Sequence, residues 1–114
     1  MNILFLCTSN VNRSKTAENL FRSLHPEHNF LSAGLSEKYC KANNSTLCTV
    51  KLLQWADRIY VFEQIHIDRI IEHTGTRYLS RITNLDIEDV YAYMEDRLCV
   101  HLKSKLESRL ISKG

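Results

Sequence analysis

The sequence predicts an α/β domain, a three-layer sandwich in which a four-stranded parallel sheet carries helices on both faces. Short apolar runs typical of buried strands alternate along the chain with segments whose apolar residues repeat at helical spacing. No linker, internal repeat or low-complexity segment interrupts the 114 residues, which include only three glycines and one proline. Alternating strands and helices form parallel sheets with right-handed crossovers, so we expect one domain spanning residues 1–114.

The first predicted elements are a buried strand and an amphipathic helix. Residues 2–7 (NILFLC) form a continuous apolar run, which fits a strand buried on both faces. A polar loop follows, and Ser14 is the predicted N-cap of the helix. The residues at i, i+3, i+4 and i+7 on one helical face are Ala17, Leu20, Phe21 and Leu24. The sequence HPEH at 25–28 is predicted to end this helix.

The next segments predict a strand, a loop and a helix. Residues 29–34 (NFLSAG) are the second predicted strand, closed by Gly34. The segment 35–44 is polar and is predicted to be a loop. A second helix is predicted from the spacing of Leu47, Val50, Leu53 and Trp55.

The last third of the chain completes the alternation. The third strand is predicted within 57–63 (DRIYVFE), with 59–62 as its core. The third helix is marked by Ile67, Ile70 and Ile71, and Gly75 is its predicted stop. Residues 81–87 (RITNLDI) are the fourth predicted strand. A long final helix is predicted from an apolar stripe of Met94, Leu98, Leu102, Leu106 and Leu110.

Composition and charge exclude several classes of protein. Hydrophobic residues make up 44% of the chain, which fits a folded globular domain rather than a disordered segment. The net charge of +2 is small and the charges are interleaved, so we expect no nucleic-acid partner. The apolar start is too short for a membrane span and no basic residue precedes it, so we expect neither a signal peptide nor a membrane partner.

The cysteines and histidines suggest neither a disulfide framework nor a metal site. No two cysteines have C-x-x-C spacing and no secretion signal accompanies them, which predicts reduced thiols in a cytoplasmic protein. The cysteines are Cys7, Cys40, Cys48 and Cys99. His25 and His28 flank a proline and are predicted to be surface residues of a turn. We therefore expect no metal and no cofactor.

The loop after the first strand has the features of an anion-binding site. Ligand sites of parallel α/β sheets lie at the carboxyl ends of the strands, where this loop falls. Main-chain N–H groups of the loop and of the first helical turn can converge on an anion, and the helix dipole adds partial positive charge. The loop residues are Thr8, Ser9, Asn10, Val11 and Asn12.

The residues on either side of this loop supply reactive groups. Arg13 can hold two oxygens of a phosphate at once. Cys7 lies at the floor of the loop, where the same donors favour thiolate over thiol, and Ser14 can donate a hydrogen bond to the sulfur. A thiolate beneath a bound phosphoryl group suits covalent phosphoryl transfer.

The spacing C-x5-R is a weak motif by itself. The other three cysteines lack it, since the residues six positions after them are Thr46, Gln54 and Lys105. The one match follows a predicted buried strand and precedes a predicted helix, which strengthens it. The competing interpretation is that Cys7 is an ordinary buried residue at a strand end and Arg13 a solvated residue at a helix start.

The stretch ILFLCTSNVNRSKTAENLF resembles the active-site loop of the low-molecular-weight protein tyrosine phosphatases, in which a hydrophobic strand is followed by C-x5-R-S and a helix. The matching residues are Cys7, Asn10, Arg13, Ser14, Ala17 and Glu18. Residues 32–34 (SAG), 55–63 (WADRIYVFE) and 85–98 (LDIEDVYAYMEDRL) also resemble that family. The resemblance covers nearly the whole chain.

This resemblance implies a fold, an activity and roles for single residues. The fold is a four-stranded parallel sheet of flavodoxin-like order 2-1-3-4, and the activity is phosphomonoester hydrolysis through a phosphocysteine. Cys7 is then the nucleophile and Arg13 binds the equatorial oxygens, while Asn10 braces the loop. Ser14 stabilises the thiolate. The implied substrate is a phosphotyrosine protein or a small aryl phosphate, and we expect a monomer or a weak dimer.

The family also uses an aspartate of a late loop, first as general acid and then as general base. Its D-P-Y motif matches best at Asp89-Val90-Tyr91, with Asp86 as the alternative acid. Without the resemblance, Asp89 would be taken for a solvated loop residue or a helix cap.

In the family, aromatic residues wall a narrow slot for phosphotyrosine. The candidates here are Tyr91, Tyr93 and Tyr39, for which an ordinary half-buried tyrosine is the competing interpretation.

Three positions depart from the family pattern. Asn12 stands where many members carry a second cysteine that can form a protective disulfide, so this protection is expected to be absent. Lys15 replaces the usual proline and places a positive charge at the rim, which favours acidic substrates. Val90 replaces the proline of D-P-Y, which predicts a less rigid acid loop.

Two other functions remain open on the same scaffold. A thiol-dependent arsenate reductase needs further cysteines to carry a disulfide away from the nucleophile, and Cys40 and Cys48 are candidates by residue type. The other is a non-catalytic module that binds phosphate or a phosphopeptide. The presence of Cys7, Arg13 and a candidate acid argues against that module.

Overall fold

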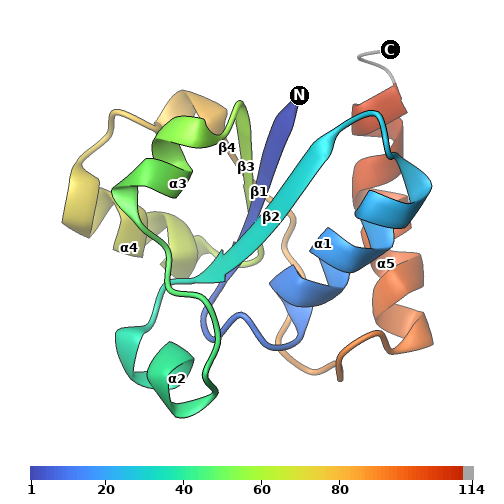
Figure 1. Ribbon diagram of the computed structural model, residues 1–114, viewed down its shortest axis with the longest axis horizontal. Helices are drawn as coiled ribbons and strands as arrows, with labels where there is room; N and C mark the ends of the chain where they lie inside the picture. Colours follow the sequence, from blue (N-terminus) through green and yellow to red (C-terminus); the bar gives the residue numbers. More distant parts are fainter. Residues whose placement is uncertain (112–114) are drawn as a thin grey trace.

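A four-stranded parallel sheet forms the centre of the molecule (Figure 1). The computed structural model describes the chain through residue 111 and its side chains through residue 107. The strands stand in the order β2-β1-β3-β4, and each neighbouring pair is parallel. Their bounds are β1 Asn2–Cys7, β2 Asn29–Gly34, β3 Arg58–Val61 and β4 Ile82–Asn84. The predicted sheet and its strand order are confirmed.

Helices cover both faces of the sheet, which confirms the predicted three layers. On one face lie α1 (Arg13–Leu24) and α5 (Asp96–Ile111). On the other lie α3 (Val50–Trp55) and α4 (Gln64–Thr74) (Figure 1). The short α2 (Glu37–Ala42) follows β2 near the ends of the strands (Figure 1). No helix in the described part of the chain is long and apolar enough to cross a membrane.

Aromatic rings fill the layer between the sheet and the α1–α5 face. The ring of Phe5 stacks on the rings of Phe21, Phe30 and Tyr60 at centroid distances of 6.0, 6.1 and 5.8 Å. The residues of α5 that complete this layer are Leu98, Leu102 and Leu106, all fully buried. The predicted stripe of the final helix is therefore correct at these three positions.

The layer on the other face of the sheet is mainly aliphatic. The strand residues that point into it are Leu4, Leu6, Ile59 and Val61, all fully buried. Leu53 of α3 and Ile70 of α4 pack in the same layer. Because β1 is buried on both faces, its sequence shows no alternation of apolar and polar residues.

Two predictions about the first helix and the loop after β2 are wrong. Helix α1 begins at Arg13, with Asn12 in the N-cap position, so Ser14 is not the cap. Ser14 lies in the first helical turn and is fully buried. Its hydroxyl contacts Cys7 and Asn10 and is therefore not used to cap the helix. The segment 35–44, predicted to be a loop, contains α2. Only Cys40 of that short helix is buried, so no apolar stripe marks it in the sequence.

The elements near the C-terminus differ from the predictions in their bounds. A 3₁₀ helix, η1 (Leu79–Arg81), precedes β4, and β4 ends earlier than the predicted strand 81–87. The extended backbone is broken at Asp86, which has a positive φ of 56°. Met94 also has a positive φ, of 58°, and lies before α5 begins, so it is not part of the apolar stripe. The side chain of Leu110 lies outside the described residues.

Candidate active site

The loop between β1 and α1 lies where the strands end and is held from one side by the segment after β2. The N–H of Leu35 donates to the carbonyl oxygen of Cys7 at 2.9 Å, and the N–H of Ser36 donates to that of Thr8 at 3.0 Å. Cys40 Sγ lies 3.7 Å from the carbonyl oxygen of Ser9. Val11 and Asn12, at the other end of the loop, are partly exposed. The backbone of the first half of the loop is therefore anchored to neighbouring chain.

A chain of hydrogen bonds leads to the sulfur of Cys7. Cys7 Sγ lies 3.0 Å from Ser14 Oγ. The side-chain amide of Asn10 donates to Ser14 Oγ at 2.8 Å and to Ser32 Oγ at 2.9 Å. Because Ser14 accepts from Asn10, its own hydroxyl hydrogen is free to be donated to the sulfur. Asn10 has a φ of 56°, a conformation that asparagine tolerates better than most residues.

A buried carboxylate anchors the far end of this chain. Ser32 donates to Glu18 Oε1, so the Ser32 oxygen is available to accept from Asn10. Glu18 is 5% exposed, and its charge is balanced by Arg22 at 2.6 Å and Lys15 at 3.5 Å. Sequence reasoning noted Glu18 and Ser32 only as parts of matching motifs. The structure joins them to Cys7 through Asn10 and Ser14.

Arg13 is buried and is held along one side of its guanidinium group. Its Nη1 donates to Glu63 Oε2 at 2.7 Å and to the carbonyl oxygen of Ile87 at 2.8 Å. The side chain is 2% exposed, which rules out the solvated arginine of the competing interpretation. Its Nε is buried and makes no hydrogen bond to any described residue. One N–H of a buried cation is thus left without a hydrogen-bond partner within the described part of the chain.

The two candidate acids differ in their relation to Arg13. Asp89 Oδ1 lies 3.7 Å from Arg13 Nε, and the Asp89 side chain is 59% exposed. Asp86 is exposed and makes no ion pair with any described residue, although its N–H donates to Asn84 at 2.9 Å. The structure therefore brings Asp89, and not Asp86, next to Arg13.

The three candidate slot tyrosines lie on different parts of the surface. Tyr91 packs edge-on against the His101 ring at 6.3 Å, so it faces α5. Tyr93 is 47% exposed, and its hydroxyl accepts from Asn19 of α1 at 2.7 Å. Tyr39 is 50% exposed on α2. No contact joins any two of these rings among the described residues, so the slot stays a prediction.

His66 is a site residue that sequence reasoning missed. It stands in the first turn of α4, where it forms a capping box with Glu63. Its ring is buried, and Nε2 lies 3.1 Å from Thr8 Oγ1. Burial, followed by the Arg13 charge, lowers the pKa of His66 to about 4. The pattern E-x-x-H directly after an apolar strand was the available signal.

The other cysteines are packed rather than paired. Cys40 is 2% exposed, and its sulfur contacts the carbonyl oxygen of Thr46 at 3.6 Å. Burial raises the pKa of Cys48 to about 12, so its thiol stays protonated at neutral pH. Cys99 is partly exposed on α5. Within the described residues no group of histidines, cysteines and carboxylates could hold a metal ion.

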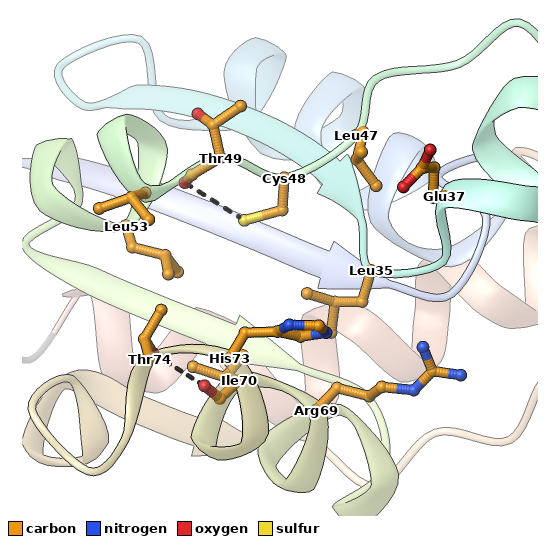
Figure 2. A pocket seen from close by; sticks show the side chains of 11 residues that line it. Leu35, Glu37, Leu47, Cys48, Thr49, Leu53, Arg69, Ile70, His73 and Thr74 are labelled. Carbon is orange, nitrogen blue, oxygen red and sulfur yellow. Dashed lines mark hydrogen bonds between the residues drawn. The ribbon is translucent and has the colours of Figure 1, made fainter.

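A cavity of about 480 Å³ opens on the α3–α4 face (Figure 2). Leu53 and Ile70 belong to its wall, and Arg69, His73 and Cys48 supply its polar groups (Figure 2). Leu35, whose N–H donates to the carbonyl oxygen of Cys7, is part of the cavity wall, whereas Cys7, Arg13 and Asp89 are not. The cavity therefore adjoins the loop through Leu35, but the groups suited to phosphate binding do not line it.

Comparison with known proteins decides the family. The model of the low molecular weight phosphotyrosine protein phosphatases matches residues 2–110. This chain belongs to that family. The predicted relationship is therefore confirmed, and so is the predicted class of enzyme, a phosphatase. No curated protein matches the sequence significantly.

Solved structures of low molecular weight phosphatases share the fold. Wzb from Escherichia coli K30, a tyrosine phosphatase in complex with phosphate, is 21% identical over 99% of this chain and 98% of its own, with a TM-score of 0.78. The tyrosine phosphatase AmsI of Erwinia amylovora is 21% identical over 97% of this chain and 91% of its own, with a TM-score of 0.78. The arginine phosphatase YwlE of Geobacillus stearothermophilus is 19% identical over 99% of this chain and 97% of its own, with a TM-score of 0.66.

Proposed function

We propose that this phosphatase hydrolyses phosphotyrosine-type phosphomonoesters through a covalent phosphocysteine on Cys7. One observation carries the proposal: the loop that joins Cys7 to Arg13 begins with a buried thiol 3.0 Å from a hydroxyl and ends with a buried guanidinium whose Nε has no hydrogen-bond partner in the described part of the chain. A buried donor without a partner is costly unless a ligand satisfies it. A phosphate dianion supplies an acceptor for this Nε–H.

Substrate binding uses the loop backbone and Arg13. The N–H groups of residues 8–12 and the start of α1 bind the non-bridging oxygens, and the guanidinium of Arg13 binds two of them from its Nε side. Glu63 and the Ile87 carbonyl hold Nη1, so the guanidinium does not need to reorganise when the phosphate enters. The same contacts stabilise the charge on the equatorial oxygens in the transition state.

In the first chemical step the Cys7 thiolate attacks phosphorus. The S–P bond forms as the bond from phosphorus to the leaving oxygen breaks, and protonated Asp89 donates its proton to that oxygen. The Ser14 hydroxyl donates to the thiolate before attack, which favours the ionised sulfur. Asp89 is the acid that we choose because its carboxylate lies 3.7 Å from Arg13 and is solvent-exposed, whereas Asp86 makes no such contact with the described residues.

In the second step water hydrolyses the phosphocysteine. The Asp89 carboxylate takes a proton from a water molecule whose oxygen attacks phosphorus. The S–P bond breaks, the electron pair returns to sulfur, and inorganic phosphate leaves. No metal or cofactor enters either step, so activity is expected to persist in the presence of a chelator.

The substrate class is supported by the family and by the 86–95 segment. The description of the family names phosphotyrosine, and two solved relatives are tyrosine phosphatases. Tyr91 and Tyr93 follow Asp89 on the same segment, which can present aromatic surface to a phenyl ring. We propose phosphotyrosine proteins or small aryl phosphates as substrates, a cytoplasmic location that suits four unpaired cysteines, and a monomer or weak dimer.

The reductase alternative receives no support from the cysteines. A second thiol must attack the first as a thiolate. Burial raises the pKa of Cys48 to about 12, and Cys40 is packed under the loop backbone. Neither residue is suited to resolve a disulfide with Cys7.

The first experiment measures hydrolysis of para-nitrophenyl phosphate in the presence of EDTA. The wild type is compared with Cys7→Ser and with the matched variant Cys48→Ser, whose sulfur the mechanism does not use. We expect turnover in the wild type and Cys48→Ser and none in Cys7→Ser. Absence of turnover by the reduced wild type would refute the proposal. Turnover by Cys7→Ser at the wild-type rate would also refute it.

A further inference from the structure

The first turn of α4 contacts both ends of the loop between Cys7 and Arg13. Glu63, the N-cap residue of α4, accepts a hydrogen bond from Arg13 at the end of the loop at 2.7 Å. His66, three residues later, lies 3.1 Å from the hydroxyl of Thr8 at the start of the loop. A single helical turn thus links the first and last residues of the site. The separation along the chain is 50 residues for one contact and 58 for the other.

The hydrogen bonds of the His66 ring determine where its proton lies. Nδ1 accepts from the N–H of Phe62 at 3.2 Å and from the N–H of Glu63 at 3.1 Å. A ring nitrogen that accepts cannot carry a hydrogen, so in the neutral ring the proton is on Nε2. Nε2 therefore donates to Thr8 Oγ1. The Thr8 oxygen is the acceptor, and its own hydroxyl hydrogen points away from the ring.

The neutral form of His66 is favoured by its surroundings. Burial and the charges of Arg13 and Arg69 lower the pKa of His66 to about 4, against the opposing effect of Glu63. These three are the charged groups that act on the ring. The ring is therefore neutral between pH 5 and pH 8, and the direction of the hydrogen bond to Thr8 does not change in that range.

We propose that His66 is a positioning residue of the phosphatase site: its Nε2–H holds Thr8, and with it the first peptide groups of the phosphate-binding loop, in the conformation that binds the phosphoryl group. The inference rests on the proposed function of the loop. It goes further by assigning a role to a helix-capping histidine that touches neither the sulfur nor the arginine. Among the described residues, the main-chain hydrogen bonds that remain at the start of the loop when this bond is lost come from the segment after β2.

Two substitutions separate this role from helix capping. His66→Asn places an amide oxygen near the position of Nδ1, so it can still accept from the N–H groups of Phe62 and Glu63, but it does not reach Thr8. Thr8→Val removes the acceptor and leaves the His66 cap intact. Thr8→Ser keeps the hydroxyl and is the matched control. A double variant, Thr8→Val with His66→Asn, tests whether the two residues act through one bond.

The experiment measures kcat/KM for para-nitrophenyl phosphate, the affinity for inorganic phosphate and the melting temperature of each variant. We expect His66→Asn and Thr8→Val each to lower kcat/KM and phosphate affinity about tenfold, the double variant to be no worse than either, and Thr8→Ser, which keeps the acceptor, to lose less than Thr8→Val. The pH profile of kcat/KM between pH 5 and pH 8 is expected to keep its shape in His66→Asn while its height falls.

Several results would overturn the proposal. Wild-type kinetics in Thr8→Val, or additive losses in the double variant, would show that the bond does not position the loop. A change in the shape of the pH profile of His66→Asn would instead indicate a titrating role. If His66→Asn does not fold, the comparison of Thr8→Val with Thr8→Ser decides. If the wild type hydrolyses nothing but binds phosphate, the proposed function fails, and the phosphate affinity of the variants still tests the role of His66. A wild type that does not bind phosphate refutes both the proposed function and the role of His66.

Discussion

The sulfur of Cys7 lies 3.0 Å from the hydroxyl oxygen of Ser14, a residue of the first turn of the following helix. Both side chains are buried, and Asn10 donates to the same hydroxyl oxygen at 2.8 Å. The serine therefore has one hydrogen to donate, and the sulfur is its available acceptor. This contact connects the geometry of the loop to the reactivity that we propose for Cys7.

Ser14→Ala removes the hydroxyl that faces the sulfur. We expect kcat/KM for para-nitrophenyl phosphate to fall about tenfold, because a hydrogen bond to a charged group is lost. Steady-state kinetics measure the effect, and the control is Ser23→Ala, an exposed serine of the same helix. Equal activity in Ser14→Ala and Ser23→Ala would show that the contact has no role in the reaction.

Asp89→Asn removes the proposed acid without changing the size of the side chain. We expect kcat to fall about a hundredfold for phenyl phosphate and much less for para-nitrophenyl phosphate, since a good leaving group needs little protonation. Asp86→Asn is the matched control and is expected to retain wild-type rates. Rates measured over a series of substituted phenyl phosphates test this, and a larger loss in Asp86→Asn would reverse the assignment.

The buried His66 predicts a dependence of stability on pH. Its pKa is lowered from 6.5 to about 4 in the folded chain, so between these values the unfolded state binds more protons than the folded state. The free energy of unfolding therefore rises with pH across this window, and the contribution of His66 to it is lost as pH falls. The maximum contribution of this group is about 3 kcal/mol.

Urea unfolding at pH 7 and pH 4 measures this contribution. The difference in the free energy of unfolding between the two pH values is expected to be smaller in His66→Asn than in the wild type, because asparagine does not titrate. Carboxylates titrate in both proteins and cancel in the comparison. The same pH difference in both proteins would mean that His66 does not become protonated on unfolding.

The structure leaves no space for a side chain at Gly34. A Cβ there would lie 2.3 Å from Cys40 Sγ and 2.8 Å from the carbonyl oxygen of Thr8. We expect Gly34→Ala to lower the free energy of unfolding by about 1–3 kcal/mol, as overpacking does, and to lower activity because Thr8 belongs to the loop. Adding Cys40→Ala is expected to restore part of the stability, since the sulfur can be removed but the Thr8 carbonyl cannot.

Gly75→Ala provides the contrast. Its Cβ would meet nothing within 4 Å, but its φ of 73° is strained for alanine. This variant is expected to lose stability and to keep wild-type kcat/KM. Chemical denaturation and kinetics of the two glycine variants separate the two effects. Full activity in Gly34→Ala would contradict the argument from the loop.

The predicted fold was correct where burial leaves a continuous run or a helical stripe of apolar residues in the sequence. The run at β1 and the stripe of Leu98, Leu102 and Leu106 both reflect contact with a large apolar surface. Two of the predictions that failed concern segments without such contact. Helix α2 buries only Cys40, and Met94 lies outside α5.

The site could be predicted in part. Cys7 and Arg13 stand at the two ends of one loop, so the short motif and its context pointed to both. Asp89 was identified through resemblance alone, since an exposed aspartate carries no signal of its own. Glu63 and His66 were missed because their roles depend on contacts with residues 50 and 58 positions away.

The sequence by itself determined the alternation of strands and helices, the family, and the loop that joins a thiol to a guanidinium, because these depend on neighbours along the chain. Only the tertiary structure decided which groups surround that loop. The carboxyl ends of β1 and β3 lie side by side in the parallel sheet, and this brings the first turn of α4 to Thr8 and Arg13. Hydrogen bonds of this kind follow from the order of strands in space, which no local pattern of residues encodes.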